Sequence, residues 1–147
     1  MSTIKRVMVI CTGNICRSPM AAAILQEELR SNDIEVTSAG LGALGGHEAD
    51  ALAVMLMEER GLDVNGHRAV QFDGQRGLAC DLILVMETAQ RRAIEQNWTL
   101  LQGRVYRLGH WGKFDVDDPY QRGEQAFRKS LTTIDRGVGQ WLEVITA

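Results

Sequence analysis

The chain has 147 residues, 45% of them hydrophobic and 24% charged, and its 16 Lys and Arg against 19 Asp and Glu give a formal net charge of −3. This length suits one folded domain, and we expect residues 1–147 to form it. No apolar run approaches the ~20 residues of a membrane helix and no secretory signal is recognisable, so we expect a cytoplasmic protein without membrane insertion. The mild acidity predicts no general affinity for nucleic acid, so an anion site has to be built from local groups.

The three cysteines, Cys11, Cys16 and Cys80, narrow the chemistry further. An odd number of cysteines in a chain of this length argues against a disulfide scaffold. The gap of four residues between Cys11 and Cys16 differs from that of most zinc knuckles, and no second Cys or His pair completes a metal cage. We therefore expect no bound metal. The cysteines are either unreactive thiols in the core or take part in thiolate chemistry.

Apolar runs of strand length alternate with amphipathic runs of helix length along the chain. The predicted strands are 5–10, 35–39, 81–86 and 105–108, and the predicted helices are 20–29, 49–60, one beginning near Thr88, and a long one at the C-terminal end. Gly61 stands where a left-handed C-terminal cap is expected. The unbroken apolar run 82–85 is typical of a central parallel strand.

The C-terminal helix is predicted by apolar residues that recur at steps of four and three. These residues are Phe127, Leu131, Ile134, Val138, Trp141 and Ile145. Their stripe should face the sheet, although Gly137 and Gly139 weaken the helix and its last turns are expected to fray. The alternation predicts an α/β fold with three layers: a four-stranded parallel sheet flanked by helices, with right-handed crossovers. Functional loops in such sheets follow the carboxyl ends of the strands.

The segment after the first predicted strand has the composition of a phosphate-binding loop. It reads Cys-Thr-Gly-Asn-Ile-Cys-Arg-Ser-Pro over residues 11–19 and leads into the first predicted helix. Gly13 and Asn14 tolerate the positive φ angles that turn successive N–H groups inward, and Pro19 suits a first helical turn. Arg17 adds a planar guanidinium that can hold two oxygens of one phosphate. The predicted binding residues for a tetrahedral dianion are Thr12, Gly13, Asn14, Ile15, Cys16, Arg17 and Ser18.

Cys11 is the candidate nucleophile of this loop. The N–H groups, the start of the helix, Arg17 and the hydroxyl of Ser18 all favour its thiolate over its thiol. A thiolate held against phosphorus can attack it while Arg17 and the N–H groups hold the phosphoryl oxygens. This chemistry needs no cofactor, and the lysine and glycine spacing of a Walker loop are absent. A cysteine six residues before an arginine is common by chance, so the accompanying Gly, Asn, Ser and Pro carry the prediction.

The segment 11–19 resembles the signature loop of the low-molecular-weight protein tyrosine phosphatases, and Asp-Asp-Pro-Tyr at 117–120 resembles the acid loop of that family. The resemblance covers essentially the whole chain. It includes Thr-Ser-Ala-Gly at 37–40, Gly-His-Arg-Ala at 66–69, Val-Met-Glu at 85–87 and Gly-His-Trp at 109–111. The last of these segments is similar to the corresponding segment in the bacterial branch of the family, whose members act on tyrosine kinases of polysaccharide export.

Three aspartates, Asp115, Asp117 and Asp118, are candidates for a general acid. Removing phosphate from tyrosine expels a phenolate whose conjugate acid has a pKa of roughly 10, so a proton donor lowers the barrier. Composition alone favours a solvated acidic loop stiffened by Pro119, whereas the resemblance implies that Asp118 is the acid. It also implies that Tyr120 stacks on the substrate ring; an exposed turn tyrosine is the alternative.

Three further positions bear on substrate and redox behaviour. Related arginine-phosphate phosphatases tend to carry Thr where this chain has Ile15, so we expect a preference for phosphotyrosine. Gln121 stands where many family members have a second aromatic residue, so one aromatic contact with the substrate that the family pattern implies is missing here. Cys16 is either a small buried residue or, as the resemblance implies, a thiol that forms a reversible disulfide with Cys11 on oxidation.

Asn14, Ser18, Ser38 and His67 are expected to support the loop from behind. Asn14 should hold the left-handed turn, with Ser38 and His67 as hydrogen-bonding supports for it. An ordinary structural hydrogen bond is the alternative for both Ser38 and His67. Cys80, directly before a strand, is expected in the core.

The resemblance implies a monomer that acts on a phosphotyrosine protein, with the tail of a membrane tyrosine autokinase as the expected partner. Two other functions compete with this interpretation. An arsenate reductase of the same fold relays electrons through two later cysteines, of which this chain offers only Cys80. A catalytically silent phosphate-binding module would need neither Cys11 nor Asp118.

Overall fold

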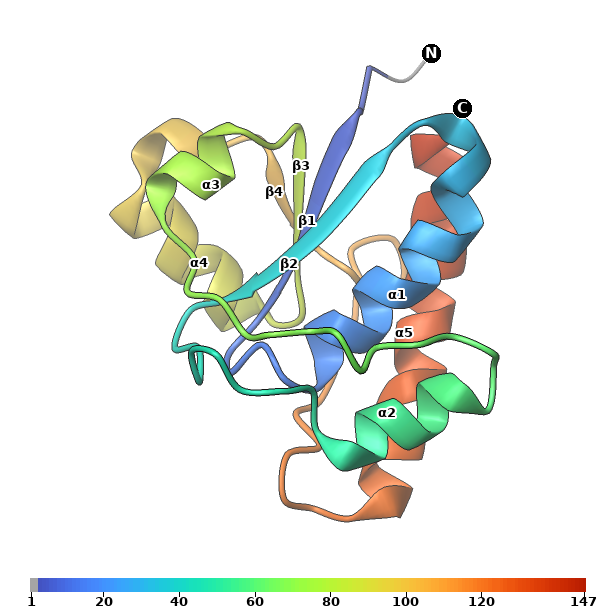
Figure 1. The fold of residues 1–147 in the computed structure, drawn as a ribbon. Coiled ribbons are helices and arrows are strands. Elements are labelled where there is room, and N and C mark those ends of the chain that lie inside the picture. Colours follow the sequence, from blue (N-terminus) through green and yellow to red (C-terminus); the bar gives the residue numbers. More distant parts are fainter. Residues whose placement is uncertain (1–2) are drawn as a thin grey trace.

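Four parallel strands form the centre of the structure, a computed structural model that describes residues 3–147 (Figure 1). They are β1 (Arg6–Cys11), β2 (Glu35–Gly40), β3 (Leu82–Val85) and β4 (Val105–Arg107), and their order in the sheet is β2-β1-β3-β4. Because β1 lies between β2 and β3, the loop that follows it leaves the middle of the sheet. This is the topological position where α/β sheets place their ligands.

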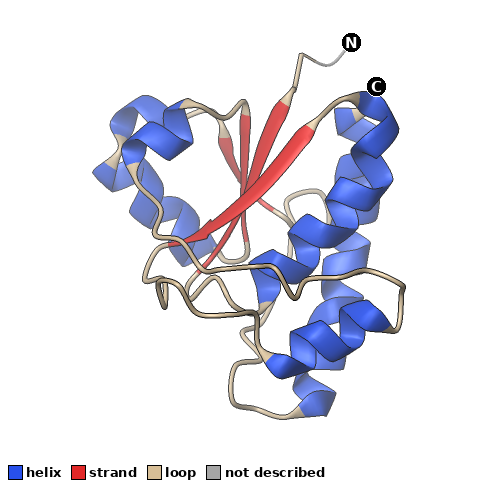
Figure 2. Ribbon diagram, in the orientation of Figure 1, coloured by secondary structure: helices blue, strands red, loops and turns tan. Residues whose placement is uncertain are grey.

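Helices cover both faces of this sheet, so the predicted three-layer α/β fold is confirmed (Figure 2). The helices are α1 (Arg17–Leu29), α2 (Ala51–Glu58), α3 (Gly74–Leu78), α4 (Thr88–Asn97) and α5 (Glu124–Ile145), with short 3₁₀ turns at Arg30–Asn32 and Thr99–Leu101. Figure 1 shows α1, α2 and α5 on one side of the sheet and α3 and α4 on the other.

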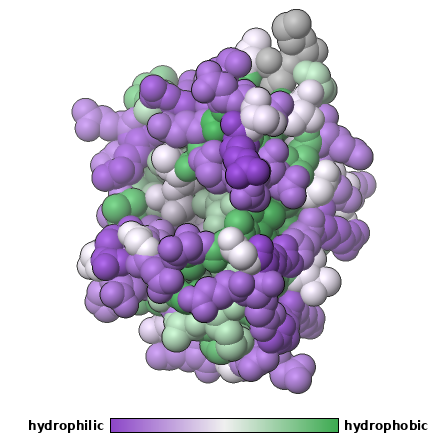
Figure 3. All heavy atoms as spheres, turned by 45° about the vertical axis from the view of Figure 1, so that its right-hand side comes forward, coloured by the Kyte–Doolittle hydropathy of each residue, from purple (hydrophilic) through white to green (hydrophobic). Residues whose placement is uncertain are grey.

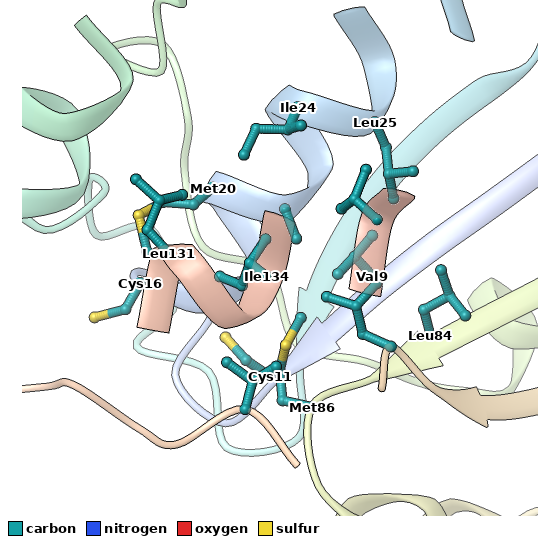
Figure 4. Packing of buried hydrophobic residues seen from close by; sticks show 14 of the residues in the cluster. Val9, Cys11, Cys16, Met20, Ile24, Leu25, Leu84, Met86, Leu131 and Ile134 are labelled. Atoms are coloured by element: carbon teal, nitrogen blue, oxygen red, sulfur yellow. The ribbon is translucent and has the colours of Figure 1, made fainter. Parts of the chain in front are cut away.

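Successive side chains of β1 point to opposite faces of the sheet, so they contribute to two separate hydrophobic clusters. Val7 and Val9 pack in the cluster that joins the sheet to α1, α2 and α5. Met8 and Ile10 pack in a second cluster with Ile94 of α4. Figure 4 shows the first cluster, with Cys11 and Cys16 among its labelled members. The loop that follows β1 is therefore anchored at both ends in packed apolar side chains.

The predicted stripe of α5 is confirmed, because all six of its apolar residues are buried. The helix runs unbroken to Ile145, so the expectation that its last turns fray is not supported. Gly137 has a packing role: a Cβ at this position would lie 2.8 Å from both the carbonyl oxygen and the Cγ of Leu108. The glycine lets α5 approach the end of β4 closely, and packing stabilises the helix where intrinsic propensity does not.

Several predicted boundaries differ from the structure. Strand β1 is shifted by one residue, to Arg6–Cys11, and helix α1 begins earlier than predicted, at Arg17, while it ends at Leu29 as predicted. Helix α4 begins at Thr88, and Glu87 caps it through a reciprocal capping box with Gln90. Gly61 has the expected positive φ, 74°. Helix α3 was not predicted; it is five residues long.

The face shown in Figure 3 is mostly hydrophilic, and its hydrophobic side chains gather in recesses between charged ones. None of the helices within residues 3–147 is long and apolar enough to cross a membrane.

Candidate active site

The loop between β1 and α1 opens onto a pocket of about 170 Å³. Residues from this loop, from the loop after β2 and from the segment before α5 line it: Cys11, Thr12, Gly13, Ile15, Cys16, Arg17, Gly42, Leu44, Asp118 and Tyr120. The structure thus brings the predicted nucleophile, the predicted arginine and the predicted acid to one cavity, although Asp118 is about a hundred residues from Cys11 along the chain.

Cys11 lies at the carboxyl end of β1, only 2% exposed, with two hydrogen-bond partners for its sulfur. The backbone N–H of Asn14 points to Sγ at 3.3 Å, and Ser18 Oγ lies 2.9 Å from Sγ. Because Ser18 Oγ accepts a hydrogen bond from Asn14 Nδ2 at 2.8 Å, its own proton is free to be donated to Cys11. Both contacts point a hydrogen at the sulfur and fix its position at the base of the loop.

Asn14 is the structural centre of the loop. It is fully buried and has a φ of 60°, in the left-handed region that asparagine tolerates better than most residues. Besides Ser18, its Nδ2 donates to Ser38 Oγ at 3.0 Å, and its Oδ1 accepts from the N–H of Val70 at 2.9 Å. Its carbonyl lies 2.6 Å from His67 Nε2, which must carry the proton because a carbonyl only accepts. Ser38 and His67 therefore both contact Asn14, as expected.

Gly40, the last residue of β2, allows β2 to approach the phosphate loop. A Cβ at Gly40 would lie 2.4 Å from the carbonyl oxygen of Thr12 and 3.0 Å from Asn14 Cβ. No larger residue fits there without moving the loop backbone. Gly40 is part of the family-like segment 37–40, but sequence reasoning gave it no role.

Arg17 is 1% exposed and is held from behind by two acceptors. Its Nη1 donates to a carboxylate oxygen of Glu87 and to the carbonyl of Val116, the latter at 2.8 Å. Its Nη2 lies 3.8 Å from Asp118 Oδ2, and its buried Nε has no hydrogen-bond partner within residues 3–147. Burying an unpaired N–H is costly, so an oxygen of a bound phosphate would complete this group.

Gln90 connects the phosphate loop to the turn between β3 and α4. Its Oε1 accepts from the N–H groups of Met86 and Glu87 at 2.9 and 3.0 Å, and its Nε2 donates to Thr12 Oγ1 at 3.1 Å. The same turn supplies the carboxylate that holds Arg17. Sequence reasoning missed these contacts of Glu87 and Gln90, and the family-like segment 85–87 was the available signal for Glu87.

The structure separates the three candidate acids. The carboxylate of Asp115 is engaged in hydrogen bonds outside the pocket. Its Oδ1 accepts from the N–H and the hydroxyl of Thr88, both at 3.2 Å, and from Arg107 at 3.0 Å. Asp117 does not line the pocket, whereas Asp118 does. Asp118 is held by the N–H of Tyr120, which donates to Oδ1 at 3.1 Å.

Part of the wall of the pocket is formed by large apolar and aromatic side chains. Tyr120 is 39% exposed and lines the pocket, so it is at once an exposed turn tyrosine and a wall of the cavity. Ile15 and Leu44 form further walls. Leu44 was missed, because an exposed leucine in the loop after β2 carries no sequence signal.

The other two cysteines are both buried free thiols. Cys16 lines the pocket, and burial, reinforced by the charges of Asp50, Cys11 and Asp118, raises the pKa of its thiol well above the ordinary range. The thiol form of Cys16 is therefore favoured at neutral pH. Cys80 packs in the second core cluster before β3, as predicted. No group of three or more His, Cys, Asp or Glu side chains suited to a metal occurs in the described part of the chain.

Comparisons with known proteins identify the family of this chain. The family model "Low molecular weight phosphotyrosine protein phosphatase" matches residues 6–147. The "Probable low molecular weight protein-tyrosine-phosphatase EpsP" of Ralstonia solanacearum is 46% identical over 144 residues, 98% of each chain. The crystal structure of the tyrosine phosphatase Wzb from Escherichia coli K30 with sulphate superposes with a TM-score of 0.91 at 33% identity, over 97% of this chain and 99% of that one.

A second solved structure is that of Vibrio vulnificus Wzb in complex with benzylphosphonate. It has a TM-score of 0.90 at 34% identity, over 95% of this chain and 98% of that one. The family model spans nearly all described residues, and the relatives match over nearly their whole length. Together they assign the family. The chain belongs to the low molecular weight phosphotyrosine protein phosphatase family and is a protein-tyrosine phosphatase.

Proposed function

We propose that the protein, acting as a single monomeric domain, hydrolyses phosphotyrosine through a cysteinyl-phosphate intermediate on Cys11. The observation that carries this proposal is the shared pocket. Cys11 Sγ lies at its base, Arg17 and the loop surround the position of a phosphate, and the carboxyl of Asp118 lies at the rim beside Tyr120. Nucleophile, anion-binding groups and proton donor thus meet around one space.

In the first step, the Cys11 thiolate attacks phosphorus and the bond from phosphorus to the tyrosine oxygen breaks. Asp118, in its protonated form, gives its proton to that oxygen, because the phenolate would otherwise leave as a strong base. Arg17 and the loop N–H groups hold the three phosphoryl oxygens as charge redistributes. Glu87 and Val116 fix the guanidinium of Arg17, so little reorganisation is needed during the reaction.

In the second step, water attacks the phosphorus of the cysteinyl phosphate. Asp118, now a carboxylate, takes a proton from that water, the S–P bond breaks, and the thiolate and inorganic phosphate are regenerated. Ser18 donates a hydrogen bond to the departing sulfur, which favours thiolate as the leaving group.

The walls of the pocket favour an aryl phosphate. Ile15, Leu44 and Tyr120 present apolar surface around a nucleophile that is almost fully buried. A phenyl ring extends from the phosphate to this rim and packs against it, whereas the short side chain of phosphoserine would leave the rim empty.

The placement of Cys80 weighs against arsenate reduction by a cysteine relay. Cys80 precedes β3, and Asp81 is bonded to the amino end of β1, whereas Cys11 lies at the carboxyl end of β1. About six residues of extended chain separate Cys80 from the pocket end of β3, or roughly 20 Å. The two sulfurs lie at opposite ends of the sheet.

The function is tested by assaying the purified protein, with a metal chelator present, on phosphotyrosine, phosphoserine and phosphoarginine peptides and on arsenate with thioredoxin. We expect turnover of the phosphotyrosine peptide, at a kcat/KM at least about tenfold above that of the other phosphopeptides, and no arsenate reduction. Preferred turnover of phosphoarginine, or thioredoxin-dependent arsenate reduction, would contradict the proposal.

We place the physiological substrate in the cytoplasm, as the phosphorylated tyrosine-rich tail of a membrane tyrosine autokinase of polysaccharide export. The support is the likeness of residues 109–111 to the bacterial branch of the family, together with the resemblance to the proteins named EpsP and Wzb. In cells, Cys11→Ser should raise the amount of phosphotyrosine on that tail. An unchanged phosphoproteome would refute the proposal that this tail is the substrate.

Cys16 is proposed to protect Cys11 from irreversible oxidation. Peroxide would convert the Cys11 thiolate to a sulfenic acid, and the Cys16 thiol would then displace water to form a disulfide that a dithiol reduces. We expect peroxide-treated protein to regain activity with a dithiol, and Cys16→Ser to regain much less. Equal recovery of both proteins would exclude the protective role.

A further inference from the structure

A second cavity lies beside the catalytic pocket and shares Asp118 with it. It has a volume of about 280 Å³ and lies between the acid loop and the first turns of α5. Its polar lining residues include Asp117, Asp118, Arg122, Gln125, Lys129 and Ser130. The two cavities therefore meet at Asp118.

Arg122 and Lys129 bring two positive charges to this cavity, and both residues are exposed. Neither has an acidic partner within 4.0 Å among residues 3–147, whereas Arg107 and Arg128 each pair with a carboxylate. Gln125 and Lys129 are four residues apart and so share one side of the start of α5, and Arg122 lies in the turn that precedes the N-cap Gly123. The cavity thus has a wall of unpaired cations.

Among residues 3–147, neither aspartate of the cavity forms an ion pair with Arg122 or Lys129. Asp118 is directed to the catalytic pocket, where it accepts from the N–H of Tyr120 and lies 3.8 Å from Arg17 Nη2. In the proposed first step it carries a proton and no charge. Asp117 is anchored by its carbonyl, which accepts a hydrogen bond from Ser130 at 2.7 Å. During phosphoryl transfer to Cys11, the lining of the cavity therefore carries the charges of Arg122 and Lys129 against that of Asp117.

We infer that this cavity is a substrate subsite that binds an anionic side chain of the phosphotyrosine protein. Arg122 and Lys129 would hold its carboxylate or phosphate, with the amide of Gln125 as a further donor. An extended peptide advances roughly 3.3–3.6 Å per residue, so an anion within about three residues of the reacting phosphotyrosine reaches across Asp118 into the cavity. The inference rests on the proposed phosphatase function and adds a sequence preference to it.

The test measures kcat/KM on a series of phosphotyrosine peptides that differ in one flanking residue. The residue is glutamate, a second phosphotyrosine or glutamine, moved from three positions before to three positions after the reacting tyrosine. We expect an anion at one or two positions to raise kcat/KM about threefold to tenfold over glutamine, chiefly through KM, and added salt to reduce the difference. Glutamate and phosphotyrosine distinguish a carboxylate subsite from a phosphate subsite.

The matched variants are Arg122→Gln with Lys129→Gln, and, as a control with the same change in net charge, Lys5→Gln with Arg92→Gln. Lys5 precedes β1 at the opposite end of the sheet, and Arg92 is an exposed residue of α4. The first pair should abolish the preference while turnover of para-nitrophenyl phosphate, which has no flanking residues, stays unchanged; the control pair should keep the preference.

Equal rates across the series, or a preference that survives Arg122→Gln with Lys129→Gln, would overturn the subsite and leave the phosphatase function intact. Failure to hydrolyse every phosphotyrosine peptide and para-nitrophenyl phosphate would overturn both.

Discussion

Replacing Cys11 by serine is expected to lower kcat on phosphotyrosine by at least about a thousandfold, because a serine hydroxyl stays protonated at neutral pH and is a far weaker nucleophile. Serine is close in size to cysteine. The side-chain hydrogen bonds of Asn14 that hold the surrounding loop do not involve the sulfur. The variant should therefore keep its fold and still bind inorganic phosphate. Steady-state kinetics, with the shift in Tm on adding phosphate, measures both effects.

Cys80→Ala is the control for loss of a cysteine. Cys80 is buried at the other end of the sheet, where its Sγ donates to the carbonyl of Arg76 at 3.3 Å. This variant should lose some stability but keep kcat within about twofold, since Cys80 does not line the pocket. A Cys11→Ser protein with more than a tenth of the wild-type kcat would remove Cys11 from the reaction.

Replacing Asp118 by alanine is expected to lower kcat on phenyl phosphate by about 10²- to 10⁴-fold, the range associated with loss of a general acid. The loss should be smaller in the first step for para-nitrophenyl phosphate, because its leaving group is a weaker base and needs less protonation. The second step loses its general base with either substrate. Para-nitrophenol should therefore appear as a burst that matches the enzyme concentration, followed by slow turnover, in stopped-flow absorbance.

Asp117→Ala distinguishes the two adjacent carboxylates. Asp117 does not line the catalytic pocket, so its removal should change kcat on para-nitrophenyl phosphate by no more than about threefold. If Asp117→Ala produces the large loss and Asp118→Ala does not, the proton donor has been assigned to the wrong residue.

The fold was predictable where the sequence carries a periodic apolar signal. The stripe of α5 and the apolar run of β3 gave the right elements in the right order. Helix α1 begins earlier than its apolar stripe, because Arg17 and Ser18 are buried by the site and not by the core. Helix α3 has no stripe at all; its Gly77 lies so close to Leu101 that an added Cβ would come within 2.6 Å of that side chain.

The site was predictable as far as it is continuous in sequence. The loop from Cys11 to Ser18 and the acid loop each carry their functional residues within a few positions, so their chemistry could be recognised from residue types. The parts that act across the fold carry no local pattern. The carboxylate of Glu87 behind Arg17, the amide of Gln90 on Thr12 and the N–H of Val70 on Asn14 depend on tertiary contacts between distant segments.

The most direct test of the central claim is to identify the covalent intermediate. Asp118→Ala protein is mixed with para-nitrophenyl phosphate, quenched during the burst and digested, and mass spectrometry locates the phosphate. The proposed mechanism predicts phosphate on the sulfur of Cys11, in an amount equal to the burst. Phosphate on Ser18, or a burst without covalent phosphate on any residue, would contradict it.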